Sequence, residues 1–228
     1  MSKIRISGDV HQYYDSYFSL AEECEYSLQV GDMGFNYEPL KQLDSNNHKF
    51  IGGNHDNYDT YNSCSHVIES DYGSKDYGVG IHGGSVFFFV RGSFSIDWKQ
   101  RTQYYLSRGI KTYWEQEELS MREMYDCFDL YKKTKPDFVI SHDCPRSISN
   151  RMGNGEILAQ FGYNPKSFST RTSELLEAMF QYYQPENWCF GHYHRDWSET
   201  VNGTNFRCID ELAYLDIETW ITFLLLDS

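Results

Sequence analysis

Short apolar runs separated by polar, glycine-containing turns recur along the first part of the chain. Strands are predicted at Lys3–Ser7, at residues 26–30 and at residues 49–51. Short helices are expected between these strands, at residues 18–25 and 38–43. Strands that alternate with helices indicate βαβ units and a largely parallel sheet.

Two later segments have the period of amphipathic helices. Ser120 and Glu123 have the spacing of a capping box, and the helix that begins there is expected to stop before Pro136. A second such helix is predicted at residues 169–183. The other expected elements are strands at 137–140, 187–190 and 219–226, hairpins within 78–90 and 200–209, and loops with short helices at 95–109 and 147–164.

Polar side chains that can bind metals follow the predicted strands. In open α/β sheets, ligands bind at the carboxyl ends of the strands, so these side chains are expected to meet at one edge. The motifs, in chain order, are Gly8-Asp9-Val10-His11, Gly31-Asp32, Gly53-Asn54-His55-Asp56, Ser141-His142 and Gly191-His192-Tyr193-His194.

Imidazole nitrogens mixed with carboxylate and amide oxygens suit Mn, Fe or Zn better than Ca or Mg. The motifs offer more ligands than one ion needs, which favours two ions that share a carboxylate. Taken one by one, these residues could equally be turn formers. His142 is a lone histidine after a strand, and His82 is its alternative.

The order of these five motifs resembles the calcineurin-like metallophosphoesterase superfamily. The resemblance spans residues 8–194, with each block present and in order. It implies an α/β fold, a four-layer α/β sandwich in which two mixed β-sheets pack face to face with helices outside. We expect residues 1–228 to form a single domain of this kind.

The resemblance also implies a site that binds two divalent transition-metal ions, with Mn²⁺ as first choice and Fe, Zn or Ni as alternatives. By resemblance, the first ion takes Asp9, His11 and His194. The second ion takes Asn54, His142 and His192, and Asp32 bridges the two ions.

The same resemblance implies a hydrolytic mechanism in which a metal-activated hydroxide attacks phosphorus. His55 is then the general acid that protonates the leaving oxygen, and Asp56 orients His55.

Two arginines are candidates for holding the substrate phosphate. Arg91 and Arg101 stand in a pattern similar to that of short members of the family, and an arginine can hold a phosphate oxygen bidentately. The alternative for each is an ion pair that fixes a loop. Nearby aromatic residues could stack a nucleobase or could simply pack; they are Tyr104, Tyr105, Tyr113 and Trp114.

Composition narrows the partners. The net charge of −13 argues against duplex nucleic acid, because such binding relies on Lys and Arg. The longest apolar runs, at residues 86–90 and 221–226, are too short to span a bilayer. The six scattered cysteines contain no CxxC pair and no signal peptide is visible, so we expect a reduced, cytoplasmic protein.

Departures from the superfamily bear on the substrate. Gly31-Asp32 is not followed by the Asp-Arg pair of the Ser/Thr protein phosphatases, and Asp56 stands where that branch has Glu. The exonuclease branch carries an added DNA-binding domain, for which this chain is too short and too acidic. A phosphodiester or nucleotide-like phosphoester is therefore the expected substrate. A protein phosphatase and a non-catalytic metal-binding interaction module remain the alternatives.

Overall fold

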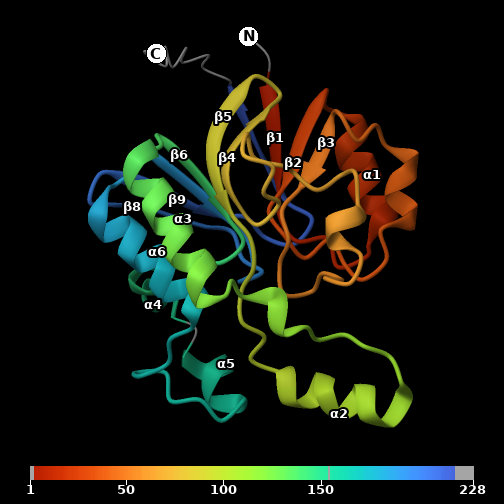
Figure 1. Ribbon diagram of the computed structural model, residues 1–228, viewed down its shortest axis with the longest axis vertical. Helices are drawn as coiled ribbons and strands as arrows, with labels where there is room; N and C mark the ends of the chain where they lie inside the picture. Colours follow the sequence, from red (N-terminus) through yellow and green to blue (C-terminus); the bar gives the residue numbers. More distant parts are fainter. Residues whose placement is uncertain (1–2, 154, 219–228) are drawn as a thin grey trace.

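The computed structural model describes residues 3–153 and 155–218, in which the strands form two sheets (Figure 1). The first sheet has the order β10 (Tyr214–Glu218), β1 (Lys3–Ser7), β2 (Tyr26–Gln29) and β3 (His48–Phe50). Strands β1, β2 and β3 are parallel, and β10 pairs antiparallel with β1. The three parallel strands therefore end at the same edge of the sheet.

The second sheet is also mixed. Its order is β4 (Tyr77–His82), β5 (Ser85–Val90), β6 (Phe138–Ser141), β7 (Asn187–Phe190), β9 (Thr204–Cys208) and β8 (Trp197–Val201). The central strands β5, β6, β7 and β9 are parallel, and β4 and β8 pair antiparallel at the two edges. Val90 is level with Ser141 and Ser141 with Phe190, so β5, β6 and β7 also end together.

Helices cover the outer faces of both sheets (Figure 1). The first sheet is covered by α1 (Tyr14–Glu22) with the 3₁₀ turns η1 (Glu38–Gln42) and η2 (Tyr61–Ser63). The second sheet is covered by α3 (Met121–Thr134), α4 (Arg146–Met152) and α6 (Arg171–Tyr182). Two further helices, α2 (Trp98–Arg108) and α5 (Gly155–Gln160), lie beyond the strand ends, and η3 (Glu115–Glu117) follows α2.

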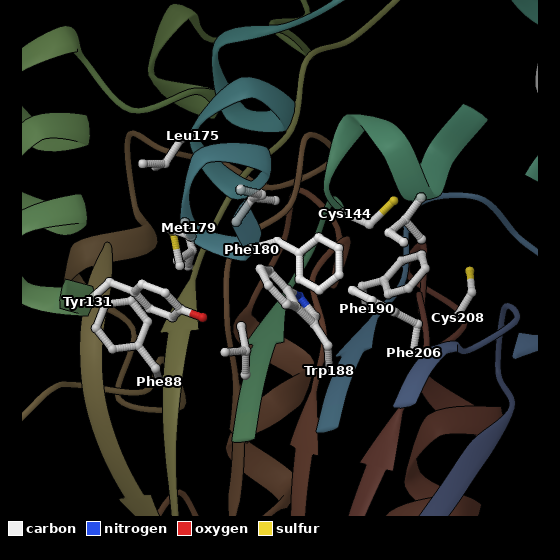
Figure 2. Packing of buried hydrophobic residues seen from close by; sticks show 14 of the residues in the cluster. Phe88, Tyr131, Cys144, Leu175, Met179, Phe180, Trp188, Phe190, Phe206 and Cys208 are labelled. Atoms are coloured by element: carbon white, nitrogen blue, oxygen red, sulfur yellow. The ribbon is translucent and has the colours of Figure 1, made fainter. Parts of the chain in front are cut away.

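The layers are held together by apolar side chains that alternate along the strands. In β5, Phe87 and Phe89 face the core between the sheets, where they meet Ile4 and Ile6 of β1. Phe88, between them, faces the core under the helices. Figure 2 shows this second core, in which Trp188 and Phe206 of the sheet lie under Phe180 of α6. The expected four-layer α/β sandwich is confirmed.

Element boundaries differ in a few places. The first helix runs over Tyr14–Glu22 rather than residues 18–25, and its buried residues are Tyr17 and Ala21. The stretch expected to be mostly loop contains the eleven-residue helix α2, in which only Arg101 is buried, so it lacks the apolar period of a packed helix. The strand expected at 219–226 lies outside the described residues. Within the described residues, no helix is long and apolar enough to cross a membrane.

Candidate metal centre

The loops that follow five parallel strands bring the predicted metal-binding side chains together. Asp9 and His11 follow β1, Asp32 follows β2, and Asn54 follows β3. The remaining members of the set come from the second sheet; they are His142, which follows β6, and His192 and His194, which follow β7. Each half of the sandwich therefore contributes to the site.

The first group of side chains converges from three motifs. Asp9, His11, Asp32 and His194 each offer one ligand atom, and these atoms all lie within 4.8 Å of one another. Nε2 of His11 lies 2.9 Å from Nε2 of His194, and the latter lies 3.2 Å from Oδ2 of Asp9. Two carboxylates and two imidazoles that face one point form a donor set suited to a divalent transition metal.

A second group adjoins the first and shares one residue with it. Nε2 of His142 lies 3.2 Å from Oδ1 of Asp32 and 3.1 Å from Oδ1 of Asn54. Nδ1 of His192 lies 3.0 Å from the same Asn54 oxygen. Asp32 turns its other oxygen toward His11, with Oδ2 3.6 Å from Nε2. Asp32 therefore stands between the two groups, where one carboxylate could contact two ions.

The backbone is strained where it presents these side chains. His11, Asp32, His192 and His194 have φ angles of 47°, 61°, 67° and 46°, in the left-handed region that residues with a Cβ rarely adopt. Such residues cost of order 1–3 kcal/mol each and cluster at functional sites. Gly53 allows the close approach, because a Cβ there would lie 2.2 Å from Oδ1 of Asp32.

The electrostatics of the metal-free site depend on protons. Burial by itself raises the pKa of Asp32, but the neighbouring histidines, with His142 first, hold that pKa well below its usual range. Burial lowers the pKa of His142 and the Asp32 charge raises it, with a net rise to about 10. A divalent ion would take over the role of these protons, because bound histidines must be neutral.

The second group also tests whether a cation fits. Nδ1 of His142 donates to the carbonyl oxygen of Val30 at 2.9 Å, so Nε2 is the nitrogen that faces Asp32 and Asn54. Acceptor atoms of three residues then point at one place, where repulsion is relieved only by a proton or a metal ion. The donor set and this convergence of acceptor atoms fit a bound cation.

His55 lies beside the first group. Its backbone N–H donates to Oδ1 of Asp32 at 2.6 Å, and its ring centroid is 4.7 Å from that of His11. Phe35 stacks on the ring, with 6.1 Å between centroids. Burial lowers the pKa of His55 to about 4, and Arg101 contributes to the lowering.

Asp56 lies next to His55 in sequence, but its carboxylate holds the surrounding backbone. It accepts from the backbone N–H groups of Asp32, Gly34 and Gly53 at 2.9, 3.2 and 2.7 Å, and from the hydroxyl of Tyr37. The expectation that Asp56 orients the His55 ring has no hydrogen bond to support it among the described residues. Three backbone donors compete for its two oxygens, and burial raises its pKa to about 7.

The two candidate arginines occupy different places. Arg101 lines the pocket beside the site, and Nη2 donates to the ring of His55. Arg91 lies outside the pocket lining; it pairs with Asp76 and donates to the carbonyl of Gln116 at 2.6 Å. The contacts of Arg91 match the alternative in which an ion pair fixes a loop.

A pocket of about 690 Å³ adjoins the candidate metal-binding residues. Asp32, His55 and His192 are among its lining residues. Its apolar lining residues are Phe94, Ile96, Ile157, Leu158, Phe161, Pro165 and Phe168, and the charged side chains of Asp97, Arg101, Asp143, Arg146 and Lys166 line it as well. The aromatic residues proposed for stacking do not line it: Tyr104 and Tyr105 are exposed, and Trp114 is buried against Phe35.

Sequence comparison agrees with the geometry. Residues 2–196 match the profile of the calcineurin-like phosphoesterase family. The chain belongs to this family. It is therefore a metallophosphoesterase, a hydrolase of phosphoric esters whose family typically binds two divalent metals. No match was found among curated proteins.

The solved structure of a dimetal phosphatase from Danio rerio supports the fold of this phosphoesterase. The Danio rerio protein is 12% identical, with a TM-score of 0.53 over 96% of this chain and 93% of the other. A phosphopantetheinyl hydrolase from Mycobacterium tuberculosis is 12% identical, with a TM-score of 0.44 over 92% of this chain and 90% of the other.

Proposed function

We propose that this single-domain phosphoesterase hydrolyses a phosphodiester or nucleotide-like phosphoester with two divalent ions. The observation that carries the proposal is the position of Asp32, whose two oxygens face two different sets of ligand atoms. The first ion would be held by Asp9, His11 and His194, and the second by Asn54, His142 and His192. Mn²⁺ is the first choice for this mixture of oxygen and imidazole donors.

Divalent ions bound there would polarise phosphoryl oxygens and lower the pKa of a water molecule toward neutrality. The chain supplies the other groups. Arg101 can donate to a phosphoryl oxygen from the pocket wall, since its Nη2 already donates to His55 at the rim of the site. His55 can hand a proton to the leaving oxygen. A negative phosphoryl group beside its ring would raise the low pKa of His55 and favour the imidazolium.

The pocket supports a substrate with a sizeable apolar portion. Its volume of about 690 Å³ lies within the roughly 300–1,000 Å³ typical of small-molecule sites. Phe94, Phe161 and Phe168 offer ring faces to a base or another flat group. The scattered cysteines support placing this activity in a reducing compartment such as the cytoplasm.

The decisive experiment compares bis-p-nitrophenyl phosphate with p-nitrophenyl phosphate, each with added Mn²⁺ and with chelator. We expect cleavage that the chelator abolishes and that favours the diester. Preference for the monoester would contradict the diester assignment and favour a nucleotide or protein phosphatase, for which Arg101 would hold the phosphate. Two bound ions without turnover of either compound or of natural nucleotides would favour a non-catalytic binding module.

A further inference from the structure

Two serines after β5 each connect a buried carboxylate to a residue of the second ligand group. Ser93 and Ser95 flank Phe94, and both are 1% exposed. Ser95 contacts Glu117 of η3, and Ser93 contacts Asp143, which follows β6. Both carboxylates are 2% exposed.

The contacts of Ser95 fix the direction of its hydroxyl proton. Its backbone N–H donates to Oε1 of Glu117 at 2.6 Å, and its hydroxyl donates to Oε2 at 2.8 Å. Because that proton is used, Oγ acts as an acceptor toward Asn54, whose Nδ2 lies 3.2 Å away. The amide of Asn54 therefore turns its NH₂ toward Ser95 and its Oδ1 toward His142 and His192.

Ser93 connects Asp143 to His192 in the way that Ser95 connects Glu117 to Asn54. Its hydroxyl donates to Oδ2 of Asp143 at 3.1 Å, so Oγ accepts from Nε2 of His192, also at 3.1 Å. With the proton on Nε2, Nδ1 of His192 carries the lone pair that faces the site. The tautomer of His192 and the orientation of Asn54 are thus set by two parallel chains of hydrogen bonds.

We propose that Glu117 and Asp143 are positioning residues that build the second ion site through Ser95 and Ser93. Glu117 sets the orientation of the Asn54 amide, and Asp143 sets the tautomer of His192. Neither carboxylate needs to touch the ion. This inference rests on the proposed two-ion function and adds the residues that decide whether the second ion is bound.

Ions at the adjacent site favour the ionised form of Glu117, which suits this role, over the protonated form that burial favours in the metal-free protein. Both of its oxygens face donors of Ser95, and a carboxylate can accept from both. Cations at the adjacent site would stabilise its negative charge. The negative charge of Glu117 then sets the direction of each hydrogen bond in the series from Glu117 through Ser95 to Asn54.

Glu117→Gln reverses that direction with almost no change in shape. The Ser95 backbone N–H can only donate, so the glutamine oxygen has to face it. The glutamine NH₂ then donates to Ser95 Oγ, whose proton turns toward Asn54. The Asn54 amide has to turn over to accept it, which points an NH₂ group at the second ion site.

The experiment is a titration of the metal-free full chain with Mn²⁺. Binding is measured by calorimetry and by the electron paramagnetic resonance signal of two coupled ions. For Glu117→Gln we expect the second ion to bind at least tenfold more weakly, and up to about 100-fold, as for other outer hydrogen-bond partners of metal ligands. The first ion should bind as in the wild type, which also shows that the variant is folded.

Glu118→Gln is the matched control. Glu118 is the neighbouring buried glutamate, but its Oε1 accepts from the backbone N–H and the hydroxyl of Thr172 at the start of α6. It makes no contact with Ser95 among the described residues. We expect this variant to bind both ions with wild-type affinity.

Three results would overturn the inference. The first is that Glu117→Gln binds two ions with wild-type affinity. The second is that Glu117→Gln lowers the affinity for the second ion no more than Glu118→Gln does. If Glu117→Gln fails to fold, the variants Ser95→Ala and Asp143→Asn take its place. The third result is then unaltered binding of the second ion in both of these variants. A wild-type protein that binds fewer than two ions would contradict the proposed function itself, which separates that failure from the others.

Discussion

Nη2 of Arg101 lies 3.2 Å from Nδ1 of His55, although the two residues are 46 positions apart in the sequence. Nη1 of the same arginine donates to the carbonyl oxygen of Asn54 at 3.0 Å. One buried side chain on α2 therefore holds both the loop after β3 and the ring proposed as the proton donor. The two residues form one wall of the pocket next to the metal-binding side chains.

Replacing His55 with alanine tests its proposed role. We expect Mn²⁺ binding to be retained and turnover to fall by about 10²–10⁴-fold, the usual contribution of general acid–base catalysis. The loss should grow as the leaving group becomes more basic, because a poor leaving group needs the proton most. Rates measured with a series of phenyl phosphodiesters would show this. An equal loss for all of them would argue against His55 as the acid.

Arg101 and Arg91 make a matched pair for separating substrate binding from folding. Arg101→Gln should raise KM for the substrate, because the pocket loses a cationic donor. Arg91→Gln should leave KM unchanged and lower the free energy of unfolding by about 1–3 kcal/mol, since Asp76 and the Gln116 carbonyl lose their partner. Steady-state kinetics and urea denaturation of both variants check this. The opposite pattern would exchange the two roles.

Asp32→Asn should reduce turnover by more than the about 100-fold typical of losing an outer-shell partner, because Asp32 faces both ligand groups. The neutral amide cannot replace a carboxylate shared by two cations. Asp59→Asn is the control, because Asp59 is an exposed carboxylate paired with Lys111. Turnover should be measured at saturating Mn²⁺. Near-normal activity of Asp32→Asn would rule out the bridging role.

The contribution of Glu117 to the stability of the metal-free protein should fall as the pH rises from about 4.5 to about 8. Burial raises the pKa of Glu117 from 4.5 to about 8, so over this range the folded state binds more protons than the unfolded state. The contribution of one such group is at most about 1.4 kcal/mol per pH unit. Urea denaturation across this pH range gives the free energy of unfolding at each pH. That free energy should fall less steeply with pH for Glu117→Gln than for the wild type. Equal slopes would contradict the assignment.

The clustering of the candidate metal-binding side chains could be predicted, because each follows a strand that the apolar pattern also predicts. Asp9, Asp32 and Asn54 come after glycines at strand ends, and parallel strands bring such ends together. No local pattern marks Glu117. It reaches Ser95 only through the path of the chain after α2, and that helix has no apolar face to reveal it.

Arg91 and Arg101 show the same limit. Both are arginines near the end of β5, and both are buried, so composition and spacing treat them alike. Their different surroundings arise from residues distant in sequence. Asp76, which precedes β4, forms an ion pair with Arg91. Arg101 lies on α2 and donates to the carbonyl oxygen of Asn54 in the loop after β3. Each arginine pairs with a carboxylate, and tertiary structure alone decides that Arg101 lines the pocket while Arg91 does not.

The backbone N–H of His192 donates to the Asp9 carboxylate across 183 positions of sequence, with 3.1 Å to each oxygen. This contact forms only when a loop of nearly the whole chain closes and brings Asp9 and His192 together. Contacts between residues so far apart in sequence form slowly, because the chain loses conformational entropy before the contact stabilises it. A growing polypeptide therefore has no complete site until β7 and the loop after it have been synthesised and docked. High-affinity metal binding should therefore appear only after β7 and that loop have docked, and its appearance would time this step of maturation.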